Sequence, residues 1–167
     1  MKRLRVGVIG VGAMGVHHAR LYHELAAAEL VGVADPREPQ AREVAAAYHT
    51  DAYTDYEQLL QQDLDSVSIA VPTSLHREVA TKAAGYGVHL LVEKPIADTL
   101  SGADAIIEAA RRAGVKLMVG HIERFNPVIQ KLKELVVGGE LGELLSISCR
   151  WPGGPQPRAD TGCGHYH

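Results

Sequence analysis

Residues 4–15, LRVGVIGVGAMG, constrain the fold more than any other part of the chain, because an apolar strand runs directly into a glycine turn. Glycine suits Gly10 for a sharp turn, Gly12 for the close approach of a pyrophosphate, and Gly15 for close packing of the next helix on the strand. A helical pattern follows over residues 13–28, and its first turn would offer free N–H groups to phosphates. The segment predicts a dinucleotide site, although a glycine turn can also join a strand to a helix without any ligand.

An acidic residue ends the next predicted strand, at a spacing that favours NAD. Residues 30–34 form a short apolar run, and Asp35 follows it twenty positions after Gly15. A carboxylate there accepts hydrogen bonds from the ribose hydroxyls of an adenosine and repels a 2'-phosphate. We therefore expect NAD as the cofactor, and the nearby Arg37 is the reason to keep NADP open.

Length and composition describe one globular core with room for the beginning of a second domain. The chain has 167 residues, 46% of them hydrophobic, and a formal net charge of −3. We find no basic patch for nucleic acid, no apolar run of membrane-spanning length and no signal peptide. The two cysteines, Cys149 and Cys163, suggest no disulfide framework. We therefore expect a cytoplasmic protein that binds neither nucleic acid nor membranes.

Strand and helix patterns alternate from the first residues to about residue 121. The alternation predicts an α/β fold, a Rossmann-type doubly wound parallel sheet covered by helices on both faces. The further strands expected are residues 66–71, 89–92 and 116–120, and the further helices are residues 38–48, 54–62, 75–84 and 99–113. Ligands of such sheets bind beyond the carboxyl ends of the strands.

The run Glu93-Lys94-Pro95 is the most informative one besides the glycines. Its lysine follows a central strand, next to the expected position of a nicotinamide. There the Lys94 amine could exchange a proton with a substrate hydroxyl while a hydride moves to the ring, and burial would favour the neutral amine. A surface lysine before a turn proline explains the same residues equally well, so both interpretations stay open.

Composition changes after Gly120, and we place a second domain at residues 122–167. A polar connector leads to a helix that begins at Pro127 and ends near residue 137. Residues 144–151 alternate apolar and polar side chains, which predicts a half-buried strand. Because this strand lacks a partner, we expect it to pair with the same strand of another subunit and form a homo-oligomer.

Together these motifs resemble the Gfo/Idh/MocA family of NAD(P)-dependent sugar and cyclitol oxidoreductases. The resemblance rests on the glycine turn followed by His18, Pro72 with His76 four positions later, Glu93-Lys94-Pro95 and residues 120–127. It implies hydride transfer between a secondary alcohol of a sugar and NAD, with Lys94 as the catalytic residue and Pro95 as a cis proline. His76 would then lie near the cofactor.

The resemblance also implies a domain organisation and a substrate class. Residues 1–121 would be the NAD(P)-binding Rossmann domain, and residues 122–167 the truncated beginning of an α/β substrate domain. The sequence of residues 120–127, with residues 139–148 and 150–160, is most similar to UDP-N-acetylglucosamine 3-dehydrogenases, with inositol dehydrogenases next. We therefore expect a sugar or nucleotide sugar, such as a UDP-N-acetylhexosamine, as the substrate.

Fourteen residues are expected to bind the dinucleotide, and no metal is expected. They are Gly10, Gly12, Ala13, Met14, Gly15, Asp35, Arg37, Val71, Pro72, Thr73, His76, Glu93, Lys94 and His121. His121 is a weaker candidate, because an exposed histidine at a hinge explains it as well. Three side chains of the tail, Cys163, His165 and His167, could form a metal clamp, but a plain tail is the interpretation we favour.

Members of this family continue well beyond the length of this chain, into a complete substrate domain. The codons of residues 163–167, read one base later, permit an apolar run of the kind expected there. Our hypothesis is that a frameshift removed most of the substrate domain. Three interpretations stay open: a dehydrogenase impaired by truncation, a catalytically inactive dinucleotide-binding module, and a half-enzyme completed by a separate substrate domain.

Overall fold

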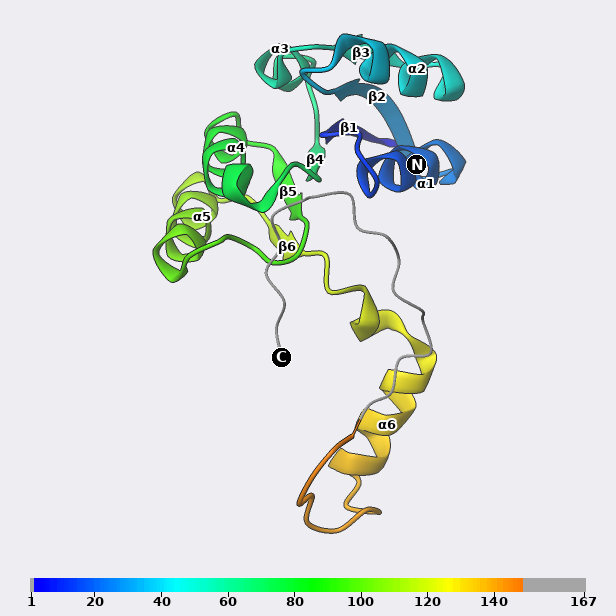
Figure 1. Ribbon diagram of the computed structural model, residues 1–167, viewed down its shortest axis with the longest axis vertical. Coiled ribbons are helices and arrows are strands. Elements are labelled where there is room, and N and C mark those ends of the chain that lie inside the picture. Colours follow the sequence, from blue (N-terminus) through cyan, green and yellow to red (C-terminus); the bar gives the residue numbers. More distant parts are fainter. Residues whose placement is uncertain (1, 149–167) are drawn as a thin grey trace. The chain divides into compact units, whose positions relative to one another are not determined.

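The computed structural model describes residues 2–148 of a chain that divides into two compact units. Unit 1 spans Met1–Gly120 and unit 2 spans His121–His167. Figure 1 shows unit 1 in blue to green, as a sheet with helices, and the start of unit 2 in yellow. The possible metal clamp of Cys163, His165 and His167 lies outside the described residues, as do residues 149–151 of the predicted strand.

A six-stranded, wholly parallel sheet forms the centre of unit 1. Its strands lie in the order β3-β2-β1-β4-β5-β6. Their bounds are β1 Leu4–Ile9, β2 Ala28–Ala34, β3 Asp51–Tyr53, β4 Ser66–Ile69, β5 His89–Val92 and β6 Leu117–Val119. The strand order reverses between β1 and β4, which is the place where doubly wound sheets open a crevice for ligands. The predicted Rossmann-type sheet is confirmed.

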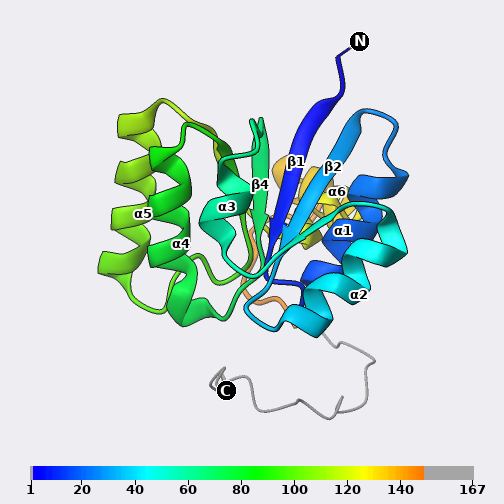
Figure 2. The ribbon, with the colours of Figure 1, turned by 90° about the horizontal axis from the view of Figure 1, so that it is seen from above.

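Five α-helices within residues 2–120 cover the two faces of the sheet. Figure 2 shows α1 and α2 on one face and α3, α4 and α5 on the other. Their bounds are α1 Gly15–Glu24, α2 Glu38–Tyr48, α3 Tyr56–Leu60, α4 Thr73–Gly85 and α5 Leu100–Ala113. Helical crossovers between parallel strands bury both faces, and the buried side chains of β1, β2 and β5 are apolar.

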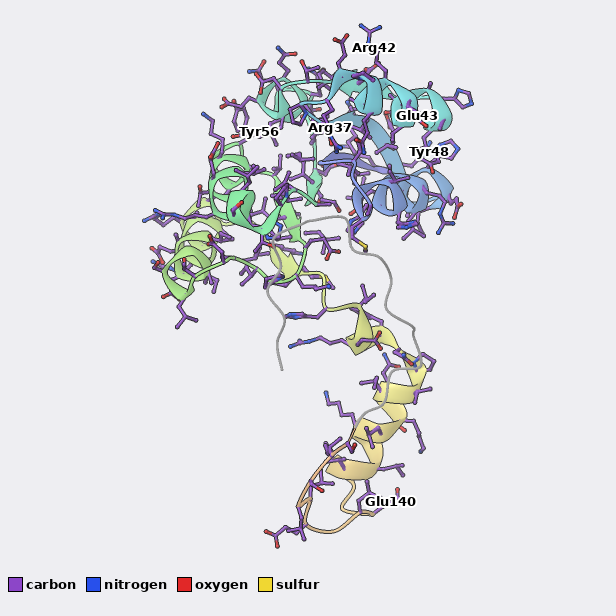
Figure 3. The ribbon with its side chains drawn as sticks, in the orientation of Figure 1. Arg37, Arg42, Glu43, Tyr48, Tyr56 and Glu140 are labelled. Atoms are coloured by element: carbon purple, nitrogen blue, oxygen red, sulfur yellow. The ribbon has the colours of Figure 1, made fainter. Side chains whose placement is uncertain are left out.

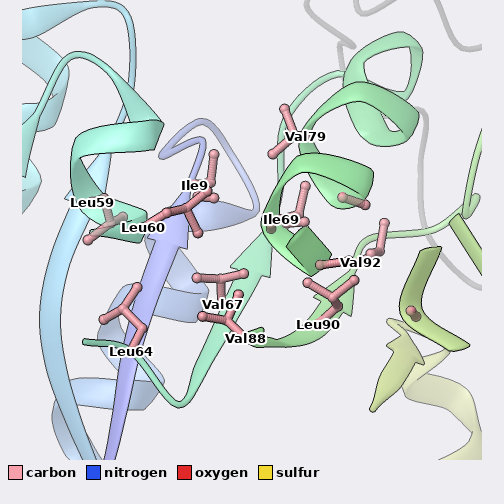
Figure 4. Close-up of a cluster of buried hydrophobic side chains, with 14 of the residues drawn as sticks. Ile9, Leu59, Leu60, Leu64, Val67, Ile69, Val79, Val88, Leu90 and Val92 are labelled. Atoms are coloured by element: carbon pink, nitrogen blue, oxygen red, sulfur yellow. The ribbon is translucent and has the colours of Figure 1, made fainter. Parts of the chain in front are cut away.

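Successive residues of β1 point into two separate apolar cores. Val8 packs with Ala19 of α1 and Val44 of α2, whereas Ile9 belongs to the larger cluster that includes Val79 of α4 (Figure 4). Val8 is fully buried and Ile9 almost so. Each such side chain stabilises the fold by about 2 kcal/mol relative to an exposed one. The alternation therefore fixes β1 between two helical layers and holds its carboxyl end in place.

Two elements differ from the sequence expectation because sheet pairing overrides local propensity. We expected the first helix to run to residue 28, but α1 ends at Glu24. Ala28 instead begins β2 and pairs with Leu4, so an alanine-rich segment that favours a helix becomes a turn and a strand. β3 was not predicted, because three residues at a sheet edge are too short to show a period.

Side-chain caps set the starts of two helices. Thr99 Oγ1 accepts a hydrogen bond from the Gly102 N–H (3.1 Å) at the start of α5, which ends at Gly114 in the left-handed conformation. At α3, Asp55 Oδ1 accepts from the Glu57 N–H (2.9 Å). A single aspartate cap thus sets the start of α3, which lies inside the helix predicted for residues 54–62.

Unit 2 begins with a 3-10 turn, Ile122–Phe125, and helix α6, Pro127–Val137. The predicted start at Pro127 is confirmed, and Asn126 Oδ1 caps the helix at the Val128 N–H (3.0 Å). Residues 144–148 form no strand, contrary to the prediction for 144–151, and no strand described within residues 2–148 pairs with them. The homo-oligomer expected from that strand stays a prediction.

No helix within residues 2–148 combines the length and the apolar character needed to cross a membrane.

Candidate functional site

The glycine turn after β1 is shaped by contacts at two glycines and left open at the third. A Cβ on Gly10, whose φ is +83°, would lie 2.8 Å from the backbone of Ala70, and one on Gly15 would lie 1.8 Å from the Gly10 oxygen. A Cβ on Gly12 would meet nothing within 4 Å. Gly10 and Gly15 are therefore required by the fold, whereas Gly12 borders free space.

The start of α1 faces this free space without a side-chain cap. Met14 occupies the cap position, is exposed and makes no capping hydrogen bond. Amides of an uncapped first turn and the positive end of the helix dipole attract anions such as phosphates. The turn formed by Gly12, Ala13 and Met14 thus fits a diphosphate, which is the group that the sequence predicted here.

Asp35 lies at the end of β2 and its carboxylate faces the same turn. Its Oδ2 atom accepts a hydrogen bond from the Val11 N–H (3.1 Å), and its Oδ1 atom accepts from the Arg37 N–H (3.0 Å) and from Arg37 Nε (3.1 Å). The residue is 4% exposed. Asp35 therefore joins the carboxyl ends of β1 and β2 at the edge where an adenosine ribose is expected.

Arg37 closes over that carboxylate from the solvent side. It is the residue immediately before α2 (Figure 3), and its side chain is 64% exposed although it forms an ion pair with Asp35. Burial alone would raise the pKa of the Asp35 carboxyl, but the hydrogen bonds from Arg37 and Val11 and the guanidinium charge hold that pKa below its ordinary value. Asp35 is thus an anion near neutral pH.

A second polar group lies at the carboxyl end of β5. Glu93 is 6% exposed, and its Oε1 atom lies 3.1 Å from Nε2 of His18 on α1. Its Oε2 atom accepts a hydrogen bond from the Lys94 N–H (3.0 Å). Lys94 itself is exposed, so the burial expected for its side chain is not found, and its amine is accessible from solvent.

His76 of α4 lies in the core rather than in open space. It is 1% exposed, and its ring nitrogens lie 2.9 Å from the Pro95 oxygen and 3.0 Å from the Val71 oxygen. Val71 and Thr73 are half-buried beside Pro72, which precedes α4. Direct contact of these residues with a cofactor stays a prediction.

The predicted residues therefore gather at two places along the sheet edge, with one residue apart from them. The glycine turn, Asp35 and Arg37 lie at the ends of β1 and β2, and residues 71–76 and 93–94 lie at the ends of β4 and β5. His121 is exposed and belongs to unit 2. Within residues 2–148, no three His, Cys, Asp or Glu side chains are grouped closely enough to hold a metal ion.

Two residues of this edge were not among the predicted site residues. Gln40 of α2 donates its side-chain amide to the Val11 oxygen, and His18 contacts Glu93 across 75 positions of sequence. His18 was part of the sequence resemblance, but no local pattern indicates its partner. The partner of His18 becomes visible only in the structure, where α1 lies beside the residue that follows β5.

Comparison with known proteins shows the family. Residues 4–121 match the Gfo/Idh/MocA family, an oxidoreductase family with an NAD-binding Rossmann fold. The chain is a member of the Gfo/Idh/MocA family. Among its relatives, the UDP-N-acetylglucosamine 3-dehydrogenase of Acidithiobacillus ferrooxidans is 42% identical over 138 residues, which are 83% of this chain and 43% of that protein. The NAD(+)-dependent scyllo-inositol 2-dehydrogenase of Bacillus subtilis is 34% identical over 144 residues, 84% of this chain and 42% of that protein.

Solved structures of other family members have the same fold. The A. ferrooxidans dehydrogenase superposes with a TM-score of 0.75 over 80% of this chain and 44% of its own. The WlbA dehydrogenase of Bordetella pertussis, in complex with NADH and UDP-GlcNAcA, is 27% identical and superposes with a TM-score of 0.80 over 84% of this chain and 44% of its own. This Gfo/Idh/MocA chain thus spans less than half the length of these relatives.

Proposed function

We propose that this chain binds NAD and forms the cofactor-binding part of a dehydrogenase that oxidises a secondary alcohol of a sugar or nucleotide sugar. The open turn at Gly12, beside the buried Asp35 carboxylate, carries this proposal. Free space and uncapped amides suit the diphosphate, and the carboxylate suits the adenosine ribose. The relatives that act on UDP-N-acetylglucosamine and on scyllo-inositol support a polyhydroxylated substrate.

Asp35 also supports NAD in preference to NADP. A buried anion at the end of β2 would repel a 2'-phosphate, whereas its oxygens can accept hydrogen bonds from ribose hydroxyls. Because Arg37 now holds both Asp35 oxygens, its exposed side chain must move aside when a ribose takes its place. Ionised Asp35 thus selects the cofactor, and Arg37 covers the carboxylate until the cofactor arrives.

Lys94 is the residue that we assign to proton transfer. Its side chain is exposed at the carboxyl end of β5, while its own N–H is fixed by Glu93. When NAD is bound, its nicotinamide supplies the acceptor for the hydride that leaves the alcohol carbon. The Lys94 amine would take the proton that leaves the alcohol oxygen, so that the alcohol becomes a carbonyl. A UDP-N-acetylhexosamine is the substrate that we would assay first.

Replacing Gly12 tests the cofactor site directly. Gly12→Val introduces a side chain whose Cβ meets nothing within 4 Å, so we expect the protein to fold normally and its affinity for NADH to fall by at least about tenfold. Isothermal titration calorimetry with NADH measures the affinity, and circular dichroism checks the fold.

The matched control is Gly85→Val at the end of α4, where a Cβ also meets nothing within 4 Å. It should bind NADH as the unaltered chain does. Absence of NADH binding by the unaltered chain, or equal binding by Gly12→Val, would contradict the proposal. Turnover with a UDP-N-acetylhexosamine is measured separately, because the chain spans only 43% of its UDP-N-acetylglucosamine relative.

A further inference from the structure

Two histidines from different helices, His76 buried and His18 largely buried, contact the residues on either side of Lys94. His76 on α4 approaches the carbonyl of Pro95, the residue after Lys94. His18 on α1 contacts Glu93, which in turn accepts the hydrogen bond of the Lys94 N–H. The two helices lie on opposite faces of the sheet (Figure 2), so the two contacts restrain Lys94 from both sides.

The contact through His18 occupies a closely fitted space. The side chains of His18 and Glu93 are 13% and 8% exposed, so both are largely removed from water. A Cβ on Gly120 would lie 2.9 Å from Glu93 Oε1, which means that the absence of a side chain at Gly120 leaves room for the carboxylate. With one oxygen on His18 and the other on the Lys94 N–H, the Glu93 carboxylate cannot rotate without losing a buried hydrogen bond.

The contact through His76 joins two strand ends. Its Nδ1 atom lies 2.9 Å from the Pro95 oxygen after β5, and its Nε2 atom lies 3.0 Å from the Val71 oxygen after β4. A carbonyl oxygen only accepts hydrogen bonds, and a neutral imidazole ring has one N–H, so such a ring donates to only one of these two oxygens. It must carry the proton on Nδ1 if it is to hold the Pro95 peptide group. The His76 ring is itself only 1% exposed and is thus shielded from water.

We propose that His18 and His76 are positioning residues that clamp the Lys94-Pro95 main chain, His18 through Glu93 and His76 through the Pro95 carbonyl. The proposal rests on the function proposed for Lys94. Its side chain is long and exposed, so its amine can be placed accurately only if the main chain of Lys94 is fixed. A displacement of about 1 Å at a reacting group can lower a rate by about a hundredfold. The two histidines therefore act on the reaction without touching the substrate.

Amide hydrogen exchange of the full chain, measured by NMR without cofactor, tests the contact through His18. His18→Leu removes the donor to Glu93, and we expect the Lys94 N–H to exchange at least about tenfold faster while the amides of β4 keep their rates. His18→Gln places an amide nitrogen near the former Nε2 position and should restore the slow exchange. His17→Leu, an exposed neighbour on the same helix, is the control and should change nothing.

Ring NMR and two amide variants test the contact through His76. We expect the His76 Nδ1 atom to carry a proton and to show coupling typical of a hydrogen-bonded N–H. His76→Asn keeps a donor near the Nδ1 position, and His76→Gln keeps one near the Nε2 position. The amide signal of Ile96, which shares a peptide group with the Pro95 oxygen, should therefore stay near its original shift in His76→Asn and move in His76→Gln.

The outcomes separate the clamp from the proposed function. Unchanged Lys94 exchange in His18→Leu, equal acceleration of all amides, failure of His18→Gln to restore protection, or an unprotonated His76 Nδ1 atom would each overturn the clamp. None of these measurements requires NADH. A chain that shows the clamp but does not bind NADH would therefore contradict the proposed function alone.

Discussion

A single carboxylate, Asp35, links the stability of this protein to pH. The hydrogen bonds and the positive charge of Arg37 hold its pKa below the ordinary value near 3.8, so the ionised form is favoured by folding. A group with a lowered pKa in the folded state stabilises the fold above its unfolded pKa, and this contribution disappears as the pH falls through the folded pKa. Asp35 therefore contributes fully at neutral pH and loses its contribution in acid.

Replacing the carboxylate by an amide tests this linkage. We expect Asp35→Asn to be less stable than the unaltered chain by about 2 kcal/mol at pH 7, because it loses charged hydrogen bonds in a buried place. The difference should shrink as the pH falls below about 4. Urea unfolding at several pH values measures it.

An exposed aspartate on α5 provides the control for this series. Asp104 takes part in no ion pair found within residues 2–148. Asp104→Asn should therefore change the free energy of unfolding by less than about 0.5 kcal/mol at every pH of the series. A stability difference for Asp35→Asn that stays constant from pH 7 to pH 3 would contradict the linkage.

Helices and strands were predictable where the signals for them lie within a few neighbouring residues. Pro127 starts α6 as the sequence indicates, and the apolar run before Gly10 forms β1. The elements that depended on distant partners were not predictable. The alanine-rich residues 26–28 favour a helix by themselves, yet their last residue pairs with β1.

The site shows the same division between local and distant information. The open space at Gly12 and the acidic residue after β2 follow from a short motif and its spacing. The contact between His18 and Glu93 does not, because it forms only when α1 packs beside the end of β5. Nor does the cover that Arg37 places over Asp35, since a sequence cannot tell whether a nearby cation binds the cofactor or the carboxylate.

The cap of α5 offers a test at this scale. Thr99→Ala removes the acceptor of the Gly102 N–H, and we expect a loss of about 1 kcal/mol in the free energy of unfolding. Ser101→Ala is the control, because its hydroxyl only approaches Thr99 Oγ1 at 3.4 Å. Urea unfolding of both variants makes the comparison, and equal stability of the two would show that the cap contributes nothing.

For the molecule as a whole, the described apolar cores belong entirely to unit 1. Their last member on α5 is Ala110, and α6 contains no buried residue. Folding free energy comes mainly from such burial, so the sheet and its helices should not depend on the residues that follow.

Shortening the chain to residues 1–120 tests this independence. We expect the midpoint of thermal unfolding to change by less than about 4 °C, which corresponds to under about 1 kcal/mol for a domain of this size. The affinity for NADH should also be kept, because the glycine turn and Asp35 both lie within unit 1. Calorimetry measures both quantities, and a much lower midpoint for the short form would mean that unit 2 supports the sheet.

The unequal roles of the three glycines have a consequence for mutational surveys of this protein. A library selected only for soluble expression would retain Gly10 and Gly15, because a methyl group at either position collides with backbone. The same library would accumulate substitutions at Gly12, where the chain itself offers no resistance. Tolerance at that position would then show that folding does not need Gly12, and a second selection, for NADH binding, would test whether the proposed cofactor site does.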